Sequence, residues 1–514
     1  MTVDRLLWRA AERWPDREAL THGAARRDFA ALAADAARFA RLLRELGVRR
    51  GDRVALLLEN SVDYVTAFFG VLGTGAAAVA LNHANKAPTH NLLLRDSGAV
   101  ALVTRAREAR RLPEIVRDCP DLRAVVVDRS VPAWELPDDG PALVERSAAA
   151  GLPVDIPGGD HGPDDLAAIL YTSGSTGTPR GVMLGHDNLV ANTEQILGYL
   201  RLTPDDSVGC VLPFHYSFGN SLLLTHVACG GRLVIDNRFA FPVKVLDTLE
   251  QERCTGFSGV PSHYAILCSR TDFLERPWPH LRYLTQAGGA MAPALQRRIR
   301  EALPERIALF VMYGQTEASA RLSYVPPERL PEKYGSIGVP IPGVSLTVRR
   351  PDGSECDTGE TGEIVAAGPN IMRGYWNAPE ETARVLHADG LHTGDLAYRD
   401  ADGFLWIVDR VKNMIKVGAN RVSPKEIEEA ILEVPGVQEA CVLGVPDELL
   451  GEAVEAWIVP VAAADSAALP QAVARHCSDR LAPYKVPRAV HLVDAIPKSA
   501  SGKVMKEELR RLAT

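Results

Sequence analysis

Short apolar runs alternate with segments of helical periodicity along the first 330 residues. Apolar runs typical of buried parallel strands lie at 54–58 (VALLL), 99–103 (AVALV) and 124–127 (AVVV). Between the first two of these runs, residues 63–73 place apolar side chains at the spacing of a helix. This alternation predicts an α/β architecture of layered sheets and helices.

A surface excursion interrupts this pattern, which then changes twice toward the C-terminus. Residues 132–165 are rich in Pro, Gly and Asp, which predicts a surface excursion before a strand at 167–171. Between 336 and 409, short strands with Gly/Asp turns predict a β-rich part. After residue 410 the period changes again, and a compact α+β unit is expected from helices and strands at 425–432, 440–443, 456–461 and 469–481.

Composition and charge exclude several classes of protein. The 514 residues are 46% hydrophobic and 24% charged, which rules out disorder and a coiled coil as the main structure. The net charge is −8, so no general basic field favours nucleic acid. The eight cysteines include no C-x-x-C pair, the N-terminus lacks the apolar core of a signal peptide, and the apolar stretch 68–81 is too short to cross a bilayer. We therefore expect a reduced, cytoplasmic protein without a membrane span.

One segment combines small, hydroxyl and cationic residues. Residues 171–181 (YTSGSTGTPRG) follow a strand-like run and hold five Ser/Thr hydroxyls, three glycines and Arg180. Small residues let backbone N–H groups approach an anion closely, which is the chemistry of a phosphate-binding loop. The segment fits neither the Walker A nor the Rossmann pattern. The alternative, a flexible Ser/Gly linker, is disfavoured because linkers rarely follow a buried strand directly.

This segment resembles the phosphate-binding signature of the adenylate-forming superfamily, which includes acyl- and aryl-CoA synthetases, stand-alone adenylation domains and luciferases. Four more segments match the family in order. Residues 287–290 (AGGA) resemble its adenine-side loop, and 313–317 (YGQTE) resemble its Y-G-x-T-E element. Residues 393–395 (TGD) resemble its ribose-binding motif, and 497–503 (PKSASGK) its catalytic-lysine loop. The resemblance covers essentially the whole chain.

The resemblance implies a nucleotide site. Tyr313 would stack on adenine, Asp395 would hold ribose hydroxyls, and Arg410 would lie near the ribose and phosphates. Taken singly, a core tyrosine, a turn aspartate and a surface arginine are the alternatives. The expected ligands of Mg²⁺, which prefers oxygen, are Glu317 and Thr176. The expected cofactor-binding residues are Thr172, Ser173, Gly174, Ser175, Thr176, Gly177, Thr178, Arg180, Gly288, Gly289, Ala290, Tyr313, Gly314, Gln315, Thr316, Asp395, Arg410 and Lys503.

Lys503 is the expected catalytic lysine. In the family this lysine contacts the attacking carboxylate and the α-phosphate, which offsets negative charge in the transition state. Lys498 and Lys506 lie close by, but only Lys503 follows Ser-Gly as the family pattern requires. The other expected catalytic residues are Thr316, Glu317 and His215.

The acid-binding pocket is expected around residues 213–220, with Val260 and the adenine-side loop. His215 would face the carboxylate side of the substrate, although a packed core histidine is an equal alternative. The segment 213–220 contains no acidic residue to pair with an ammonium group, which argues against an α-amino acid. The expected pocket residues are His215, Tyr216, Ser217, Asn220, Val260, Gly288 and Tyr313.

The resemblance also implies two domains and a hinge. We expect an N-terminal domain over 1–409, with a β-rich part at about 336–409, and a small mobile C-terminal domain over 413–514 that carries the catalytic lysine. The hinge would lie at 410–412, with Lys412 at the family's hinge position. Ala419, on the loop expected to line a thiol tunnel, departs from the Gly-Gly common in relatives.

The implied function is that of an ATP- and Mg²⁺-dependent acid ligase. A carboxylic acid would be activated as an acyl-adenylate with release of pyrophosphate. The acyl group would then pass to a thiol of CoA or of the phosphopantetheine on an acyl carrier protein. Two alternatives remain open: an enzyme with an unusual substrate or acceptor, such as an amine or nitrogen nucleophile, and a catalytically dead nucleotide-binding relative. The sequence does not identify the acid.

Overall fold

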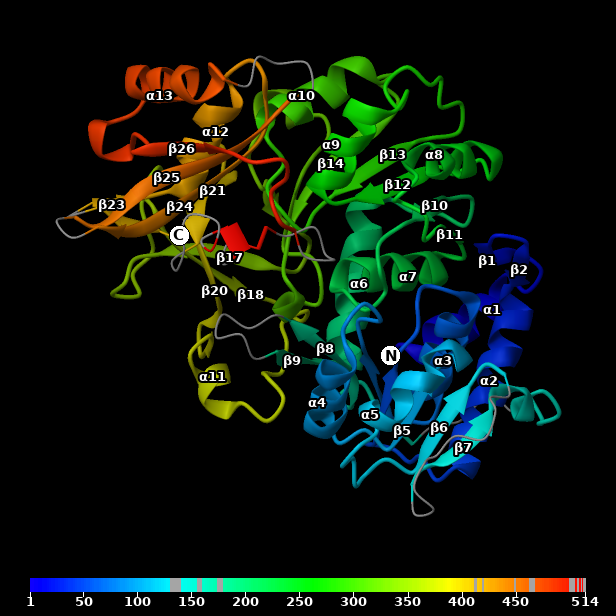
Figure 1. Ribbon diagram of the computed structural model, residues 1–514. Coiled ribbons are helices and arrows are strands. Elements are labelled where there is room, and N and C mark those ends of the chain that lie inside the picture. Colours follow the sequence, from blue (N-terminus) through cyan, green and yellow to red (C-terminus); the bar gives the residue numbers. More distant parts are fainter. Residues whose placement is uncertain are drawn as a thin grey trace.

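The described residues form four sheets covered by helices (Figure 1). The computed structural model describes residues 1–129, 140–154, 160–172, 179–410, 414–417, 420–447, 450–461, 467–498, 504–505, 508–509 and 511. Two large, mainly parallel sheets lie in the first 340 residues, and two smaller sheets follow. The layered α/β architecture expected from the sequence is confirmed.

The first large sheet has seven strands in the order β7-β6-β5-β3-β4-β8-β9. Its strands are β3 (Arg53–Leu56), β4 (Ala77–Ala80), β5 (Ala101–Thr104), β6 (Ala124–Val127), β7 (Ala142–Glu145), β8 (Leu166–Thr172) and β9 (Arg180–Gly185). All neighbours are parallel except β8 and β9. The expected strands at 54–58, 99–103, 124–127 and 167–171 are confirmed. The surface excursion contains an edge strand, β7, that was not expected, because its mostly exposed residues show no buried alternation.

The second large sheet has nine strands in the order β16-β15-β14-β13-β12-β10-β11-β1-β2. Its strands are β1 (Glu18–His22), β2 (Ala25–Asp28), β10 (Ser207–Cys210), β11 (Arg232–Ile235), β12 (Gly256–Gly259), β13 (Tyr283–Gln286), β14 (Ala308–Tyr313), β15 (Ser323–Val325) and β16 (Val339–Pro340). The strands from β14 to β1 are parallel, and antiparallel strands flank them at both edges.

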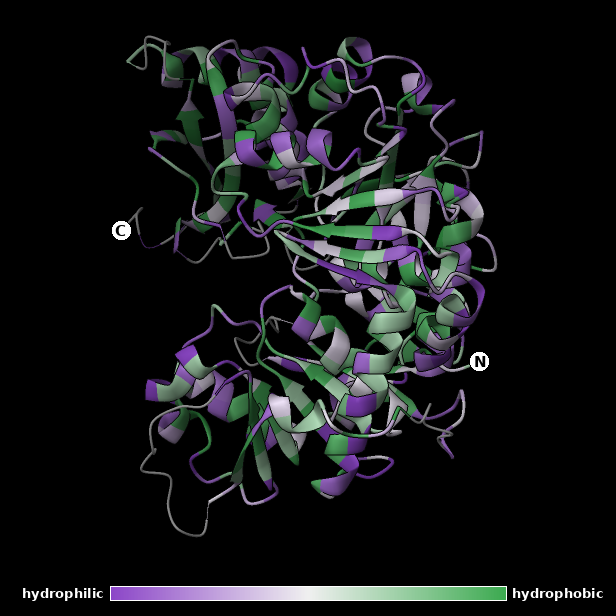
Figure 2. Cartoon of the chain, turned by 90° about the vertical axis from the view of Figure 1, so that its right-hand side faces the viewer, coloured by the Kyte–Doolittle hydropathy of each residue, from purple (hydrophilic) through white to green (hydrophobic). Residues whose placement is uncertain are grey.

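Helices form three layers around these two sheets. The central layer holds α1 (Asp4–Arg13), α2 (Phe29–Glu45), α3 (Val62–Gly73), α6 (His186–Leu200) and α7 (Ser217–Cys229). The outer layers hold α4 (Ala87–Ser97) and α5 (Leu112–Ile115) on one side, and α8 (Pro242–Gln251), α9 (Pro261–Arg270) and α10 (Pro293–Ala302) on the other. Alternate residues of each strand face opposite cores: Val103 lies in the central core, and Leu102 lies in an outer one. The apolar central strands appear green in Figure 2.

The two smaller sheets form the last third of the chain. One is antiparallel and holds β17 (Ser345–Arg349), β18 (Gly362–Ala367), β19 (Leu386–His387), β20 (Gly390–Arg399) and β21 (Leu405–Arg410), with α11 (Pro379–Ala383) beside it. The other holds β22 (Ile415–Val417), β23 (Asn420–Val422), β24 (Val437–Asp447), β25 (Gly451–Pro460) and β26 (Ala489–Leu492), with α12 (Pro424–Leu432) and α13 (Leu469–Arg480). This C-terminal unit has a hydrophobic core of its own.

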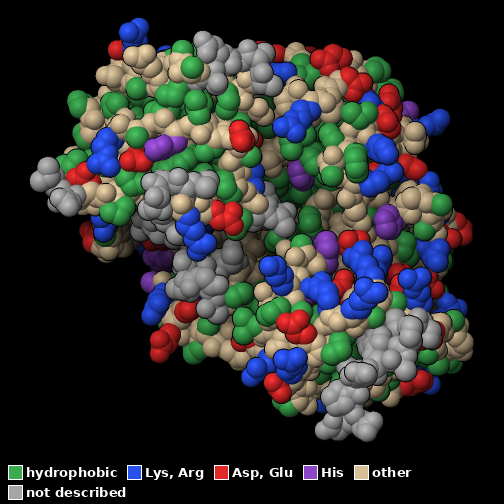
Figure 3. Space-filling view, viewed as in Figure 1, with side chains coloured by type: hydrophobic (Ala, Val, Ile, Leu, Met, Phe, Trp, Pro, Cys, Tyr) green, Lys and Arg blue, Asp and Glu red, His purple; other side chains and the backbone are tan. Residues whose placement is uncertain are grey.

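Surface and covalent features agree with the composition. Lys and Arg side chains are interspersed with Asp and Glu over the face shown in Figure 3, in keeping with the net charge of −8. None of the eight cysteines forms a disulfide. Within the described residues, no helix has both the length and the apolar character needed to span a bilayer.

Candidate functional site

A cavity of about 1530 Å³ lies at the carboxyl ends of four neighbouring parallel strands, β14, β13, β12 and β10. Lining residues follow each strand directly: 215–219 after β10, Val260 after β12, 288–291 after β13 and 314–317 after β14. The loops at this edge of an α/β sheet converge on a ligand. Residues of β20, β21 and α12 line the cavity as well.

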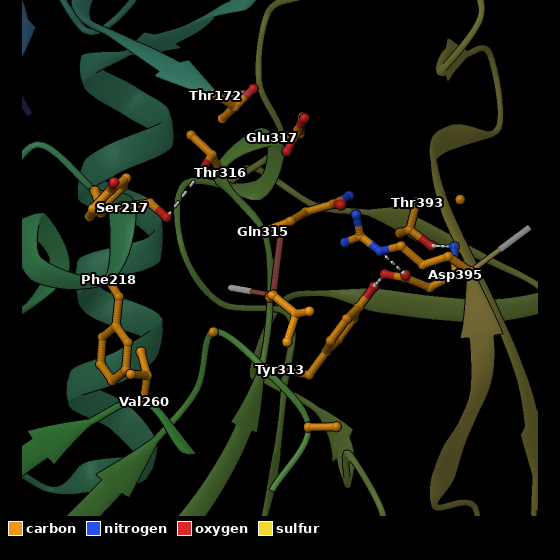
Figure 4. A pocket seen from close by; sticks show the side chains of 18 of the residues that line it. Thr172, Ser217, Phe218, Val260, Tyr313, Gln315, Thr316, Glu317, Thr393 and Asp395 are labelled. Carbon is orange, nitrogen blue, oxygen red and sulfur yellow. Dashed lines mark hydrogen bonds and ion pairs between the residues drawn. The ribbon is translucent and has the colours of Figure 1, made fainter. Parts of the chain in front are cut away.

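Asp395 is the centre of a bonded group at one end of the cavity (Figure 4). We call this the nucleotide end, because the sequence predicts Asp395, Tyr313 and Arg410 as nucleotide-binding residues. The Tyr313 hydroxyl donates to Asp395 Oδ2 at 2.6 Å, and Arg410 Nε donates to Asp395 Oδ1 at 2.9 Å. Burial, with the nearby Asp395 carboxylate, raises the pKa of the Tyr313 hydroxyl well above its usual value. The Asp395 charge raises the pKa of Arg410. The group is therefore a neutral phenol and an ion pair, fixed before any ligand arrives.

Backbone pairing explains why these residues meet. Asp395 and Arg410 are direct cross-strand partners in the β20–β21 pair. The Asp395 backbone N–H also donates to Thr393 Oγ1 at 3.2 Å. Glu363 on the neighbouring strand β18 holds the same stretch of β20, since its Oε1 accepts from the Gly394 backbone N–H at 2.9 Å. A carboxylate has about four acceptor positions, so Asp395 can still accept hydrogen bonds from two adjacent hydroxyl groups.

Thr316 and Glu317 lie in a short 3₁₀ turn directly after β14. The hydroxyl of Thr316 lies 3.3 Å from that of Ser217, the first residue of α7. Glu317 Oε1 accepts a hydrogen bond from the Tyr375 hydroxyl at 2.8 Å. Burial, followed by the Glu317 carboxylate, raises the pKa of Tyr375, so the phenol stays protonated and donates. The turn therefore brings the Thr316 hydroxyl, paired with that of Ser217, and an oriented carboxylate to the cavity.

The two residues that flank the Ser/Gly-rich segment also line the cavity. Thr172 ends β8, and Arg180 begins the neighbouring antiparallel strand β9. The Arg180 guanidinium forms an ion pair with Glu381 and lies 5.6 Å from the centre of the Tyr375 ring. Arg180 is thus held beside Tyr375, which itself contacts Glu317.

Three small residues and Gln315 complete this wall. Gly288, Gly289 and Ala290 line the cavity after β13, and Gln286 Nε2 donates to the Gly289 carbonyl at 2.8 Å. Gly288 has a φ of +86°, which favours glycine. The other residues of this wall that were expected from the sequence are Gly314 and Gln315.

At Gly314 a side chain has no room. A Cβ atom built there would lie 2.0 Å from the backbone oxygen of Ala320 and 2.7 Å from Cα of Arg321. Both obstructing atoms belong to the backbone, so a side-chain rotation cannot relieve the clash. Glycine at this position lets the chain turn sharply from β14 into the turn that carries Thr316.

The other end of the cavity is lined by His215, Tyr216, Phe218, Phe239, Val260 and His263. We call it the acyl end, because the sequence predicts the acid-binding pocket around residues 213–220 and Val260. The Tyr216 hydroxyl accepts from Asn82 Nδ2 at 3.3 Å. His215 is only 6% exposed, and its ring centre lies 4.2 Å from that of Tyr216. Burial lowers the pKa of His215 to about 3, so its imidazole is neutral near pH 7.

The structure adds some residues to the expected set and leaves one out. Asn220 is buried in α7 and is not among the lining residues, so it does not reach the cavity. Tyr375, Glu363, Phe239 and His263 were not expected from the sequence. Each is far in sequence from the group that it contacts, and no motif spacing marks it.

Several expected site residues lie outside the described residues. They are Ser173, Gly174, Ser175, Thr176, Gly177, Thr178, Lys412, Ala419 and Lys503. The structure does describe residues on either side of Lys503. Lys498 and Val504 pair as an antiparallel bridge, and both line the cavity. Lys498 Nζ donates to Glu439 Oε2 at 2.6 Å.

The oxygen atoms at the nucleotide end are of the kind that bind a magnesium ion. Oε1 of Glu317 bonds to Tyr375, while Oε2 has no hydrogen-bond partner among the described residues. Hydroxyls of Thr172 and Thr316 line the same cavity. Mg²⁺ takes oxygen ligands, commonly one or two carboxylates together with substrate phosphates. Glu317 would supply that carboxylate, as the sequence predicts.

Comparison with protein families identifies both parts of the chain. Residues 7–376 match the model of the AMP-binding enzyme family, and residues 426–503 match the C-terminal domain of AMP-binding enzymes. The first match alone covers well over half of the chain.

Individual relatives are similar in sequence to this chain over nearly its full length. A feruloyl-CoA synthase from Amycolatopsis sp is 37% identical over 98% of this chain and 97% of its own. An indoleacetate–CoA ligase from Aromatoleum aromaticum is 32% identical over 98% of this chain and 95% of its own.

Solved structures match the whole fold. An anthranilate CoA ligase, AuaEII, in complex with anthranoyl-AMP superimposes with a TM-score of 0.90 at 27% identity, covering 100% of this chain and 97% of that one. ATP-bound MatB from Rhodopseudomonas palustris gives a TM-score of 0.87 at 30% identity, covering 100% and 99%. The resemblance seen in the five sequence segments is confirmed: the chain belongs to the AMP-binding enzyme family, the adenylate-forming superfamily of acyl- and aryl-CoA synthetases, and is an AMP-forming ligase.

Proposed function

We propose that this ligase activates a carboxylic acid with ATP and transfers the acyl group to the thiol of CoA. A feruloyl-CoA synthase, an indoleacetate–CoA ligase and an anthranilate CoA ligase are among the similar proteins described above. The observation that carries the proposal is one continuous cavity that joins the Asp395 group, the Thr316–Glu317 turn and an uncharged acyl end. A nucleotide and an acid can therefore meet at the Thr316 hydroxyl.

The first half-reaction is an in-line displacement. A carboxylate oxygen of the acid attacks the α-phosphorus of ATP, the bond to the β-phosphate oxygen breaks, and pyrophosphate leaves. Tyr313 would face the adenine, and Asp395 would accept from both ribose hydroxyls while Arg410 holds its orientation. The Thr316 hydroxyl would donate to an α-phosphate oxygen, and bound Mg²⁺ would neutralise phosphate charge beside Glu317. Such fixed groups stabilise developing charge without reorganising.

In the second half-reaction a thiolate of CoA attacks the acyl carbonyl. The carbon–sulfur bond forms, the bond to the phosphate oxygen breaks, and AMP leaves. The lining residues of α12, which include Lys425 and Glu428, place the C-terminal unit at this cavity. We propose that Lys412 is the hinge at which the C-terminal domain reorients between the two half-reactions, and that 1–409 and 413–514 are the moving parts.

Lys503 is proposed as the residue that offsets charge as the carboxylate approaches the α-phosphate. The test is acid-dependent pyrophosphate release with ATP and Mg²⁺ over a panel of aryl, fatty and amino acids. Lys503→Ala is expected to lower adenylate formation by at least 100-fold and to spare thioester formation from a preformed adenylate. Lys506→Ala, three residues away, is the matched control. Unchanged pyrophosphate release in Lys503→Ala would refute the assignment.

The acceptor is tested in the same assay. Thioester formation with free CoA supports the proposal, whereas thioester formation only with a phosphopantetheine-loaded carrier protein would replace CoA. Hydroxylamine traps the adenylate as a hydroxamate and separates activation from transfer. Pyrophosphate release that is trapped by hydroxylamine but accelerated by neither thiol would point to an amine or other acceptor.

A further inference from the structure

A tight turn between β19 and β20 brings two histidines onto one face of a hairpin. His387 pairs with Gly390 across the turn, and His392 lies two residues further along β20. Residues two apart in a strand point to the same face, so the ring of His392 lies diagonally across from that of His387. The two ring centres are 4.3 Å apart. Gly390 adds no side chain to this face, which is therefore left to the two imidazoles.

Asp389, in the turn itself, completes a group of three metal-binding side chains. Its Oδ1 lies 3.4 Å from Nε2 of His392, and one ligand atom from each of the three side chains lies within 4.8 Å of the others. A tetrahedral Zn²⁺ with bonds of about 2.0–2.2 Å holds its ligand atoms about 3.3–3.6 Å apart. Asp389 and His392 already have that spacing. His387 is exposed, so rotation of its ring can close the remaining gap.

Glu363 orients the His392 ring from its other side. Oε2 of Glu363 lies 3.0 Å from Nδ1 of His392, and its Oε1 accepts from the Gly394 backbone N–H at 2.9 Å. A neutral imidazole has one N–H, and with that hydrogen on Nδ1 the lone pair of Nε2 faces Asp389. Histidines that bind a metal ion almost always donate their other N–H to a carboxylate, a carbonyl or water in this way. The second contact of the group that a metal site needs is therefore present.

The charges and atom types around the group favour one kind of cation. Asp389 and Glu363 supply two carboxylates, and Arg349 pairs with Asp389 through Nη1 at 3.5 Å from Oδ2. Oδ1, the oxygen nearer to His392, is not the one that Arg349 contacts. Two imidazole nitrogens and a carboxylate suit Zn²⁺, whereas Mg²⁺ prefers an all-oxygen shell. The group is thus chemically distinct from Glu317, where Mg²⁺ is expected.

We propose that His387, Asp389 and His392 form a Zn²⁺ site at the turn between β19 and β20. Three protein ligands leave one position of a tetrahedral ion for water or for a ligand from the cavity, which both histidines line. Zn²⁺ bound there joins the two strands at their turn and holds His392 against Glu363. Glu363 in turn holds Gly394, the residue before Asp395. This inference goes beyond acid–CoA ligation, and the site needs neither ATP nor an acid.

Calorimetry of Zn²⁺ binding tests the site directly. The untagged chain is stripped with a chelator and titrated with ZnCl₂ in the absence of nucleotide. Mg²⁺ is present in large excess, so that sites made of oxygen atoms are already occupied. One Zn²⁺ per chain is expected to bind at this turn. His387→Ala and Asp389→Asn each remove one ligand and are each expected to lower the affinity at least tenfold, because the loss of an outer contact alone commonly costs that much.

Two further variants sharpen the assignment. Glu363→Gln keeps the size of the side chain, removes its charge, and is expected to weaken Zn²⁺ binding about tenfold. His280→Ala, at an exposed position outside the cavity, is the matched control and is expected to bind Zn²⁺ like the wild type. Absence of Zn²⁺ binding to the wild type would overturn the site. Equal affinity in the wild type and in a His387→Ala, His392→Ala double variant would overturn it as well.

Thermal unfolding gives a second readout that is independent of activity. Zn²⁺ that binds the folded turn stabilises the chain by mass action, so at 100 times its Kd it is expected to raise the melting temperature by about 3 °C. The rise is expected to disappear in His387→Ala, whose exposed position leaves the fold intact without Zn²⁺. An equal rise in both proteins would overturn the site. Neither experiment measures ligation, so failure of the Zn²⁺ site and failure of the proposed function are told apart.

Discussion

The two ends of the cavity differ in how their polar groups are partnered. At the nucleotide end, Asp395 is bonded to Tyr313 and Arg410, and Glu317 is bonded to Tyr375. At the acyl end, His215 and His263 have no hydrogen-bond partner among the described residues. The nucleotide end is therefore fixed before a ligand binds, which lowers the reorganisation needed in the transition state. The acyl end leaves its imidazoles without such partners, and selectivity between acids arises where the acid binds.

Removing the centre of the fixed group tests this contrast most strongly. Asp395→Asn takes away the charge that pairs with Arg410 and the acceptor of two ribose hydroxyls. We expect kcat/KM for ATP to fall by about 100- to 1000-fold, the size of two hydrogen bonds to a charged group. The preference between two acids is expected to stay unchanged, because Asp395 does not line the acyl end. Steady-state kinetics in ATP at saturating acid measure both quantities.

The control for this change is Asp352→Asn, at an exposed turn outside the cavity. It is expected to match the wild type in both quantities. Near-normal kcat/KM for ATP in Asp395→Asn would show that the bonded group serves the fold and not the nucleotide.

Gly314→Ala is the next largest expected effect. The added Cβ would meet the Ala320 backbone oxygen at 2.0 Å, so the turn that carries Thr316 must move. Overpacking of this kind costs about 1–3 kcal/mol, and we expect at least tenfold lower activity with a lower melting temperature. Gly289→Ala is the matched control for stability, because its Cβ would meet only Pro261 at 3.5 Å. Equal melting temperatures for the two variants would contradict the steric account.

A smaller effect is expected when the Glu317 carboxylate loses the hydrogen bond from Tyr375. Tyr375→Phe removes the hydroxyl that donates to Glu317 Oε1 and keeps the ring beneath Arg180. Groups that orient a metal ligand commonly contribute about tenfold to metal affinity, so the Mg²⁺ concentration for half-maximal rate should rise about five- to tenfold. Tyr398→Phe, outside the cavity and stacked on Trp406, is the control. An unchanged Mg²⁺ requirement would place the metal away from Glu317.

Sequence reasoning reached most of the fold and one end of the cavity, because both depend on local patterns. Buried parallel strands such as β6 are continuous apolar runs, and their bounds can be read directly. Tyr313 and Thr316 belong to one short motif that ends a strand, so their place at its carboxyl end follows. The edge strand β7 was not predicted, because most of its residues are exposed and show no alternation of buried and exposed positions.

The acyl end was harder to predict because its contacts span long distances along the chain. The Asn82 side chain donates to the Tyr216 hydroxyl across 134 residues, and no spacing in the sequence marks such a pair. Asn220 was expected in the pocket but is buried in α7. That helix lies between two sheets and is buried on nearly every side, so no amphipathic period indicates which residues face the cavity.

The smallest expected effect concerns pH and the unpartnered histidines. Burial lowers the pKa of His215 to about 3, below its unfolded value of about 6.5, so the unfolded chain binds the proton more readily. The contribution is therefore fully present above pH 6.5 and is lost as pH falls toward the folded pKa. For His215 alone, the loss between pH 7 and 5.5 is about 1 kcal/mol, which is a shift of about 1–2 °C in a chain of this size. His215→Phe should flatten the decline of melting temperature over this range, whereas His280→Phe should not. An identical decline in His215→Phe would mean that folding does not lower the pKa of His215, so that its imidazole titrates alike in the folded and the unfolded chain.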